Sequence, residues 1–365
     1  MTSRKLGLVF AFLILGYFGD ARAQVAENLV IVTVDGLRWQ ELFRGIDQEL
    51  MGSRSAGVKR KADHQLMQRL WDTSPKIRRS RLFPYFWGQL VSEGVLLGNR
   101  DLGSEVIVAN RVQKSFAGYA EILTGQALDS VIKDNTPIDL PVPTLLEVLK
   151  TRLGLSTEEV ALFASWERFH HIAAKDVSQL VINAGYDILT QLPDNKTIRA
   201  LNRRQFEQLT PWTEVRHDYI TCELALEYLR IKNPKVLYLG LGETDDWAHD
   251  KRYPRVVWAA SYFDTCLKEV VEYLDESPIY RGKTLLVITT DHGRGRSAAD
   301  WSEHKKKVPG SDEIWVYWRG PGVPGRGEVS GGARAYQRDI APSVLKLLGQ
   351  PTDLIPGSDG RPIFP

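Results

Sequence analysis

Four short apolar runs alternate with longer helical stretches along this chain, and this alternation constrains its fold most strongly. The runs are Leu29–Val34, Val160–Phe163, Lys235–Gly240 and Leu285–Thr290. Each has the length and the apolar character of a strand that is buried on both faces. Because parallel strands need long crossover connections, the pattern predicts an α/β fold with a mostly parallel central sheet and helices on both faces.

Further elements follow from the same periodicities. Additional strands are expected at Val95–Leu97 and Glu313–Trp318. Helices are expected at Pro84–Glu93, Phe116–Leu123, Thr144–Thr151, Asp218–Arg230, Val256–Leu274 and Arg338–Leu348. Residues 24–365 are interpreted as a single catalytic domain, because 365 residues suit one large α/β unit.

Two segments lack this rhythm and are candidate inserts or lids, residues 46–81 and 166–213. The first holds nine basic residues against four acidic ones and shows no clear strand. This segment is either a solvent-exposed insertion without a functional role or a positively charged border of the site that attracts an anionic substrate. The second is polar and is expected to be irregular for most of its length.

The first 23 residues have the layout of a signal peptide. Arg4 and Lys5 precede an apolar run from Leu6 to Phe18, and Ala21–Ala23 forms a small-residue cleavage site. We interpret the segment as cleaved, with a retained anchor as the alternative, and expect a periplasmic or secreted protein without a stable membrane anchor. Without these residues the chain is formally neutral, so net charge indicates no nucleic-acid binding surface. Oligomeric state stays open.

Cys222 and Cys266 are the two cysteines of the chain, and both lie in expected helices. In an oxidising compartment they could pair, or each could be a buried free thiol. Their spacing alone decides neither.

Acidic residues stand at the carboxyl ends of three expected strands, where ligands bind in open α/β sheets. Asp35 ends the first strand, Asp245 follows the third, and Asp291 with His292 ends the fourth. Carboxylates and imidazoles gathered in this way are typical metal ligands. The pattern therefore predicts a metal site at this edge of the sheet.

Two more histidines extend the set. His249 lies four residues after Asp245, which places both on one face of a helical turn, and His304 follows in a polar loop. Asp246 is an alternative to Asp245, three residues before His249. The donors suit two zinc ions, with manganese or iron also possible.

Ser115 precedes the expected Phe116–Leu123 helix. Its position is that of an N-cap residue, and also that of a nucleophile at the positive end of a helix dipole. Position alone leaves both readings open.

Five short motifs occur in an order that resembles the alkaline phosphatase superfamily, on its phosphodiesterase and nucleotide pyrophosphatase side. They are Val32–Gly36, Lys114–Gly125, Gly242–His249, Thr289–Gly293 and Glu303-His304. The closing Arg338–Ser343 segment also resembles the last helix of that superfamily. The resemblance implies an alkaline phosphatase-like fold over almost the whole chain after residue 23.

The resemblance also implies roles for single residues. One zinc ion would be held by Asp245, His249 and His304. The other would be held by Asp35, Asp291, His292 and the hydroxyl oxygen of Ser115, which stands where the family has its nucleophile. Asp134-Asn135 resembles a family pair whose asparagine contacts the phosphoryl group, so Asn135 is a candidate substrate ligand, with a turn residue as the alternative.

The chain departs from the family at several points. The Cys- or Ser-x-Pro-x-Arg motif of sulfatases is absent at Ser115, and Ala117-Gly118 replace the Pro-Asn of many diesterases. No motif matches the phosphate-clamping arginine of familiar alkaline phosphatases. We therefore expect a metal-dependent phosphoric ester hydrolase that forms a phosphoserine on Ser115, with monoester and diester preference both open.

Two other functions remain as alternatives: a non-catalytic, metal-containing binding protein on the same scaffold, and a sulfatase-type ester hydrolase. The expected partner is a small phosphorylated substrate. Its organic group is not specified by the motifs, although Arg38, Glu41, Trp166 and Arg168 stand near expected strand ends and are candidates to line the pocket.

Overall fold

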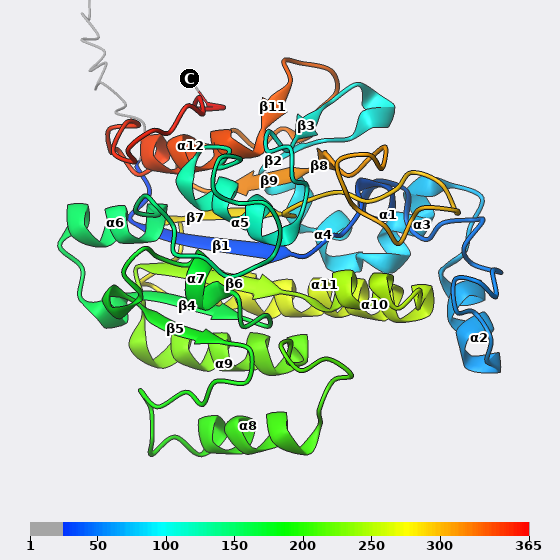
Figure 1. Cartoon of the computed structure of the whole chain (residues 1–365), viewed down its shortest axis with the longest axis horizontal. Coiled ribbons are helices and arrows are strands. Elements are labelled where there is room, and N and C mark those ends of the chain that lie inside the picture. Colours follow the sequence, from blue (N-terminus) through cyan, green and yellow to red (C-terminus); the bar gives the residue numbers. More distant parts are fainter. Residues whose placement is uncertain (1–24, 365) are drawn as a thin grey trace, which may run out of the picture.

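The computed structural model describes residues 25–364 and centres on an eight-stranded sheet (Figure 1). Its strand order is β10-β2-β9-β7-β1-β6-β4-β5. The strands are β1 (Asn28–Val34), β2 (Val95–Leu97), β4 (Val160–Ala164), β5 (Val181–Ala184), β6 (Val236–Leu241), β7 (Thr284–Thr289), β9 (Val316–Arg319) and β10 (Gly327–Glu328). Only β9 runs antiparallel to its neighbours, so the predicted mostly parallel sheet is confirmed. The predicted signal peptide lies outside the described residues.

Helices cover both faces of the sheet, as the sequence predicts (Figure 1). The α-helices of the described residues are α1 (Trp39–Arg44), α2 (Lys61–Leu70), α3 (Pro75–Leu82), α4 (Pro84–Gly88), α5 (Ser115–Thr124), α6 (Leu145–Leu153), α7 (Phe169–Ile172), α8 (Lys196–Glu207), α9 (Asp218–Lys232), α10 (Glu243–His249), α11 (Tyr253–Glu276) and α12 (Ile340–Leu347). Among residues 25–364, no helix has the length and apolar character needed to cross a membrane.

Alternate residues of β1 build two separate hydrophobic cores, because successive side chains of a strand point to opposite faces. Val30 and Val32 pack with α9 and α11, whereas Leu29 and Ile31 pack with α5, α6 and α12. Burial on both faces explains why this run is uninterruptedly apolar. The central strands are therefore fixed from both sides, which holds their carboxyl ends in place.

A disulfide joins Cys222 of α9 to Cys266 of α11, with the two Cα atoms 6.2 Å apart. Both side chains are buried between these neighbouring helices. The sequence leaves open whether Cys222 and Cys266 pair, and in the structure they are paired.

Residues 166–213 lie outside α-helices and strands for more than half of their length, as expected, and their regular elements include the edge strand β5 and the helix α8. One expected strand was wrong. Glu313–Trp318 is not one strand: it is divided between β9 and β8 (Glu313–Ile314), which belongs to a small sheet with β3 (Val106–Ile107) and β11 (Ala335–Tyr336). The division falls at Trp315, whose buried indole donates a hydrogen bond to the Leu37 carbonyl. Residues 46–81 form α2 and α3 and no strand.

Candidate metal centre and its surroundings

The predicted acidic residues meet at one edge of the sheet. Asp35 follows β1, Asp245 lies in α10 directly after β6, and Asp291 follows β7. Since β1 lies between β6 and β7 and pairs in parallel with both, the three carboxyl ends are adjacent. The topology thus brings together residues that are far apart in the sequence.

Asp35, Asp291 and His292 form one buried group that could hold a metal ion. Nε2 of His292 lies 3.4 Å from Oδ1 of Asp35 and 3.3 Å from Oδ2 of Asp291. Oγ of Ser115 lies 3.2 Å from the same nitrogen. These are the four residues that the family resemblance assigns to one ion.

Asp245 and His304 form a second buried group, which shares His292 with the first, and His249 lies beside these two residues. Nε2 of His249 lies 3.0 Å from Oδ2 of Asp245 and 3.0 Å from Nε2 of His304. Oδ1 of Asp245 faces His292 at 3.6 Å, so the two groups adjoin. Asp246 belongs to neither group, and the geometry favours Asp245 over this alternative.

The backbone orients two of the histidine rings. Nδ1 of His292 lies 2.9 Å from the carbonyl oxygen of Gly293, and Nδ1 of His304 lies 2.9 Å from that of Gln113. A carbonyl oxygen only accepts, so each Nδ1 carries the proton and each Nε2 presents its lone pair to the site. Protein metal sites fix the tautomer of their histidine ligands in this way.

Burial and charge distribute the protons of this cluster unevenly. Burial, with the nearby charges of Asp291 and Asp245, raises the pKa of Asp35 well above its usual value. Burial and Asp245 raise the pKa of Asp291 to about 7. Although burial opposes it, the Arg294 guanidinium and His249 hold the pKa of Asp245 well below its usual value. Burial lowers the pKa of His292 to about 4, which keeps this ring neutral at pH 7.

Two buried carboxylate oxygens favour a cation here. Oδ1 of Asp35 and Oδ2 of Asp291 are buried and have no hydrogen-bond partner among the described residues. Unpaired buried carboxylates are costly, and a divalent ion offsets this cost. With neutral imidazoles beside them, the donors fit zinc, which takes nitrogen and oxygen ligands.

Ser115 is the first residue of α5, and Lys114 is the N-cap, so the N-cap reading of Ser115 was wrong. Its side chain faces the site and does not cap the helix. The helix approaches the site closely because Gly118 has no side chain: a Cβ atom there would lie 2.2 Å from the Asp291 carbonyl oxygen. Close packing of α5 against the end of β7 thus places the Ser115 hydroxyl at the metal ligands.

A cavity of about 220 Å³ opens directly over Ser115 and Asp35. Asn135 lines it, and its Oδ1 accepts a hydrogen bond from the Phe116 amide at 3.1 Å. Trp166 and Arg168 also line this cavity, as do Asp245 and His249, which are candidate metal ligands. Arg38 and Glu41 do not line it: they are buried and form an ion pair with each other.

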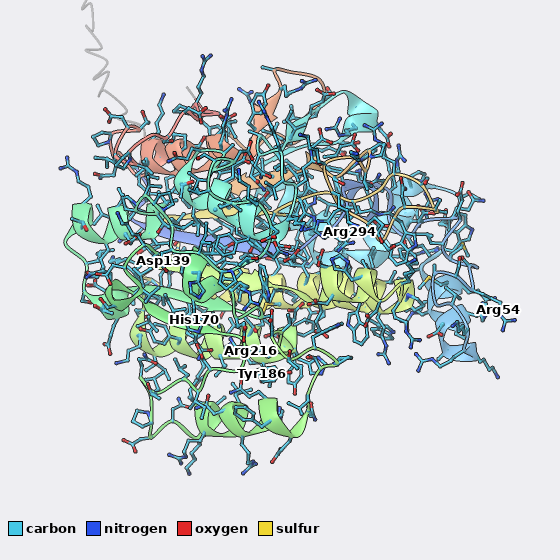
Figure 2. The ribbon with its side chains drawn as sticks, viewed as in Figure 1. Arg54, Asp139, His170, Tyr186, Arg216 and Arg294 are labelled. Atoms are coloured by element: carbon cyan, nitrogen blue, oxygen red, sulfur yellow. A yellow bond between two sulfur atoms is a disulfide. The ribbon has the colours of Figure 1, made fainter. Side chains whose placement is uncertain are left out.

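The sequence motifs did not reveal two residues near the site. Arg294 is buried and contacts the Asp245 carboxylate, and Figure 2 labels it beside the central strands. Glu214 lines the cavity and accepts a hydrogen bond from Arg168 at 2.7 Å. Arg294 follows His292 by two residues, and this position was a signal in the sequence that it lies near the site. Glu214 reaches the cavity because a β-bridge joins Trp166 to Val215, and no local sequence pattern predicts that bridge.

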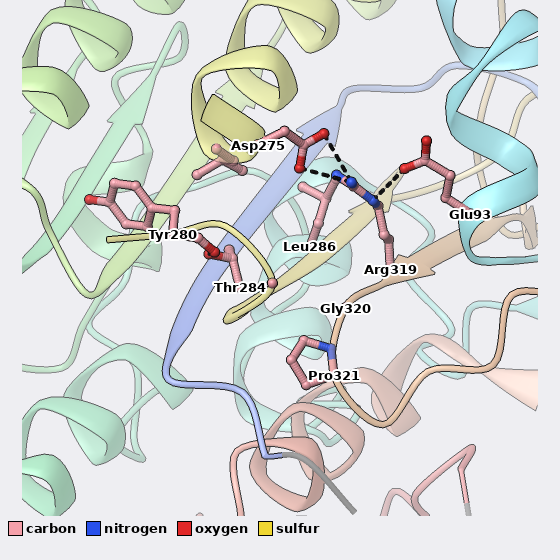
Figure 3. Close-up of a pocket in the computed structure, with 10 residues that line it drawn as sticks. Glu93, Asp275, Tyr280, Thr284, Leu286, Arg319, Gly320 and Pro321 are labelled. Atoms are coloured by element: carbon pink, nitrogen blue, oxygen red, sulfur yellow. Dashed lines mark hydrogen bonds and ion pairs between the residues drawn. The ribbon is translucent and has the colours of Figure 1, made fainter. Parts of the chain in front are cut away.

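Another cavity, of about 390 Å³, lies at the opposite edge of the sheet, near Thr284 at the start of β7 (Figure 3). Its cationic side chain, Arg319, is paired with Asp275 at 2.8 Å and with Glu93 at 2.8 Å. This positive charge is neutralised, so the cavity offers no free cation to an anionic ligand.

Comparisons with solved structures identify the fold. Wild-type alkaline phosphatase PafA superimposes with a TM-score of 0.53 and 12% identity, over 93% of this chain and 98% of that protein. A phosphonate monoester hydrolase from Silicibacter pomeroyi superimposes with a TM-score of 0.56 and 13% identity, over 92% of this chain and 76% of its own. This chain has the alkaline phosphatase-like fold.

A 2-O GAG sulfatase shares the alkaline phosphatase-like fold as well, with a TM-score of 0.56 and 13% identity over 93% of this chain and 73% of that one. No protein-family model matches the sequence, and no curated protein matches it. Because the named neighbours are a phosphatase, a phosphonate ester hydrolase and a sulfatase, the fold alone does not select a substrate.

Proposed function

We propose that this chain is a two-metal hydrolase of phosphate esters that acts through Ser115. The observation that carries the proposal is the position of Ser115, whose hydroxyl faces His292 from the first turn of α5 and which lines the cavity. A binding protein would need the metal ligands but not a hydroxyl group at this point. The structural neighbours named above, a phosphonate monoester hydrolase, a sulfatase and an alkaline phosphatase, support the same class.

The ligand assignment follows the two groups of side chains. Asp35, Asp291, His292 and Ser115 would hold one zinc ion, and Asp245, His249 and His304 would hold the other. When bound, such ions lower the pKa of a hydroxyl ligand and neutralise charge that develops on phosphoryl oxygens. Manganese or iron in place of zinc is a variant of the same proposal.

The protein residues then divide the work. Oγ of Ser115 attacks phosphorus, the ester oxygen leaves, and a phosphoserine forms; water hydrolyses this phosphoserine and regenerates Ser115. The amino end of α5 favours the anionic phosphoryl group through its dipole and its free amides. Asn135 uses Oδ1 for the Phe116 amide, which leaves its amide nitrogen to donate to a phosphoryl oxygen.

A paired assay tests the proposal. Purified, zinc-loaded protein is given p-nitrophenyl phosphate or bis-p-nitrophenyl phosphate, with and without chelator, and zinc content is measured on the same samples. We expect turnover that the chelator abolishes, and the ratio of the two rates measures monoester against diester preference. Turnover that persists after complete metal removal contradicts the metal mechanism. If neither substrate is turned over while zinc is bound, the result favours the non-catalytic binding protein. Turnover of a sulfate ester favours the sulfatase alternative.

Substitution of Ser115 separates the nucleophile from the metal site. Ser115→Ala should lose turnover by several orders of magnitude while retaining its zinc, whereas Ser92→Ala, at an exposed serine, should behave as the parent protein. Near-normal turnover of Ser115→Ala contradicts the nucleophile assignment.

We further propose that the protein is exported, to the periplasm or beyond the cell, after removal of residues 1–23. The Cys222–Cys266 disulfide supports an oxidising compartment. The mass of the exported protein tests this: a mature chain that begins at Gln24 is expected, and an uncleaved chain in the reducing cytosol would contradict it.

A further inference from the structure

Arg294 brings a permanent positive charge against one of the two metal-ligand groups. Its side chain is only 1% exposed. One terminal nitrogen contacts Oδ1 of Asp245 and lies 3.1 Å from the carbonyl oxygen of the same residue. The other terminal nitrogen donates to the Ser302 carbonyl. The guanidinium is therefore held in place by helix α10 on one side and by the loop that contains Ser302 on the other.

The two groups consequently differ in charge. Asp35 and Asp291 give the first group two carboxylates, and Arg294 makes no hydrogen bond or ion pair with either of them in the described part of the chain. The second group has a single carboxylate, Asp245, and shares it with Arg294. Once a divalent ion has displaced the protons of Asp35 and Asp291, it is therefore attracted more strongly by the first group than by the second.

The two groups also differ in access. The side chains of Asp291 and His292 are fully buried, whereas the side chain of His249 is 48% exposed. An ion in the second group can leave after movement of one exposed ring. An ion in the first group is enclosed by the ends of β1 and β7 and by the start of α5.

We propose that Arg294 makes the two sites unequal, so that the Asp35–Asp291–His292 site retains its ion while the Asp245–His249–His304 site exchanges it with the surroundings. The inference rests on the metal binding in the proposed function, but not on the reaction. Occupancy of the second site, and with it the activity, would then follow the free zinc concentration outside the protein.

Arg294 could affect the second site in two opposing ways. Its hydrogen bonds orient Asp245, and loss of such an outer partner typically weakens a metal site by about 10–100-fold. Its charge repels the ion, and two unit charges about 4 Å apart at an effective dielectric constant of about 20 already change an equilibrium on the order of a thousandfold. Because Arg294 is buried and solvent screening is weak, the charge effect dominates.

Zinc titration against a chromophoric chelator tests this inference without an activity measurement. The parent protein should bind two zinc ions in two steps that differ in affinity by about 100-fold or more. Arg294→Met keeps the bulk and removes the charge, and should tighten the weaker step about tenfold or more. Arg294→Lys keeps the charge but not the forked hydrogen bonds, and should leave the weaker step closer to the parent value than Arg294→Met does.

Two further variants complete the experiment. Arg296→Met removes an exposed arginine two residues away and should change neither step. His249→Ala should abolish the weaker step and leave the tighter one, which assigns the steps to the sites. A parent protein that fills both sites in one step overturns the inference, as does a weaker step that is unchanged or weakened in Arg294→Met. Because only bound zinc is measured, these outcomes are independent of whether the protein hydrolyses phosphate esters.

Discussion

Nδ1 of His304 donates a hydrogen bond to the backbone carbonyl of Gln113, at 2.9 Å. Gln113 stands two residues before Ser115 and has a φ of 52°, in the left-handed region. This hydrogen bond therefore joins His304, a predicted metal ligand, to the backbone that leads to Ser115, the predicted nucleophile.

This backbone conformation predicts the effect of substitutions at Gln113. Gln113→Gly should be tolerated, because glycine adopts positive φ without steric cost. Gln113→Val should lower the free energy of unfolding by about 1–2 kcal/mol, because a β-branched residue is strained there. Urea denaturation of both variants measures the difference, and equal stability would show that the left-handed conformation is not required.

The Asp218 carboxylate predicts a second effect, on the start of α10. It accepts hydrogen bonds from the Gly242 amide at 2.7 Å, the Glu243 amide at 3.1 Å and the Ser165 hydroxyl at 2.6 Å. Asp218→Asn places a donor group against these donors and should cost about 1–3 kcal/mol of stability. It should also weaken zinc binding at Asp245 and His249. Asp194→Asn, at an exposed position, serves as the control, and a stable Asp218→Asn variant with unchanged zinc affinity would refute this role.

Glu121 predicts a pH dependence of stability. Its carboxyl group is buried in α5, and burial raises its pKa to about 7, although amides including those of Ala109 and Asn110 oppose the rise. The unfolded chain has the lower pKa of about 4.5, so it releases this proton first and stability falls as pH rises between the two values. The loss is on the order of 3 kcal/mol above pH 7.

Glu121→Gln does not titrate and isolates this contribution. As pH rises from about 4.5 to about 7 with zinc present throughout, we expect the melting temperature of the parent protein to fall relative to that of Glu121→Gln. Thermal unfolding of both proteins across this range gives the comparison. A difference in melting temperature that is constant with pH would rule out the raised pKa.

The disulfide between α9 and α11 predicts a stability effect without a catalytic one. The bridged cysteines are 44 residues apart in sequence. By loop-closure entropy, a loop of this length contributes at most about 4 kcal/mol. The double variant Cys222→Ala with Cys266→Ala should melt at a lower temperature and retain its turnover at low temperature. A large loss of turnover in the folded variant would show that the bridge also positions the site.

The sequence predicts the central part of this fold well, because burial on both faces leaves a strong apolar signal in β1, β6 and β7. It also places Asp35, Asp245 and Asp291 at one edge, since strand ends of a parallel sheet meet. By contrast, β5 is missed: its four residues, Val181–Ala184, include a polar asparagine and lie at the sheet edge, where tertiary pairing decides.

Other features depend on distances that no local pattern contains. Whether Cys222 and Cys266 pair depends on how α9 packs on α11, which spacing does not reveal. The contact of Arg294 with Asp245 joins the loop after β7 to helix α10, which follows β6. The roles of the site residues stay predictions until metal content and turnover are measured.

The pairing of β1 has a consequence for biosynthesis. Leu29 lies beside Val236 on one side and beside Leu285 on the other. During synthesis, β1 therefore emerges long before its neighbours β6 and β7 have been made. His304 is synthesised after all three strands. A nascent chain that stops before residue 304 contains the proposed nucleophile but lacks a complete zinc site. The protein can therefore acquire its proposed activity only after His304 has been synthesised and β1, β6 and β7 have paired.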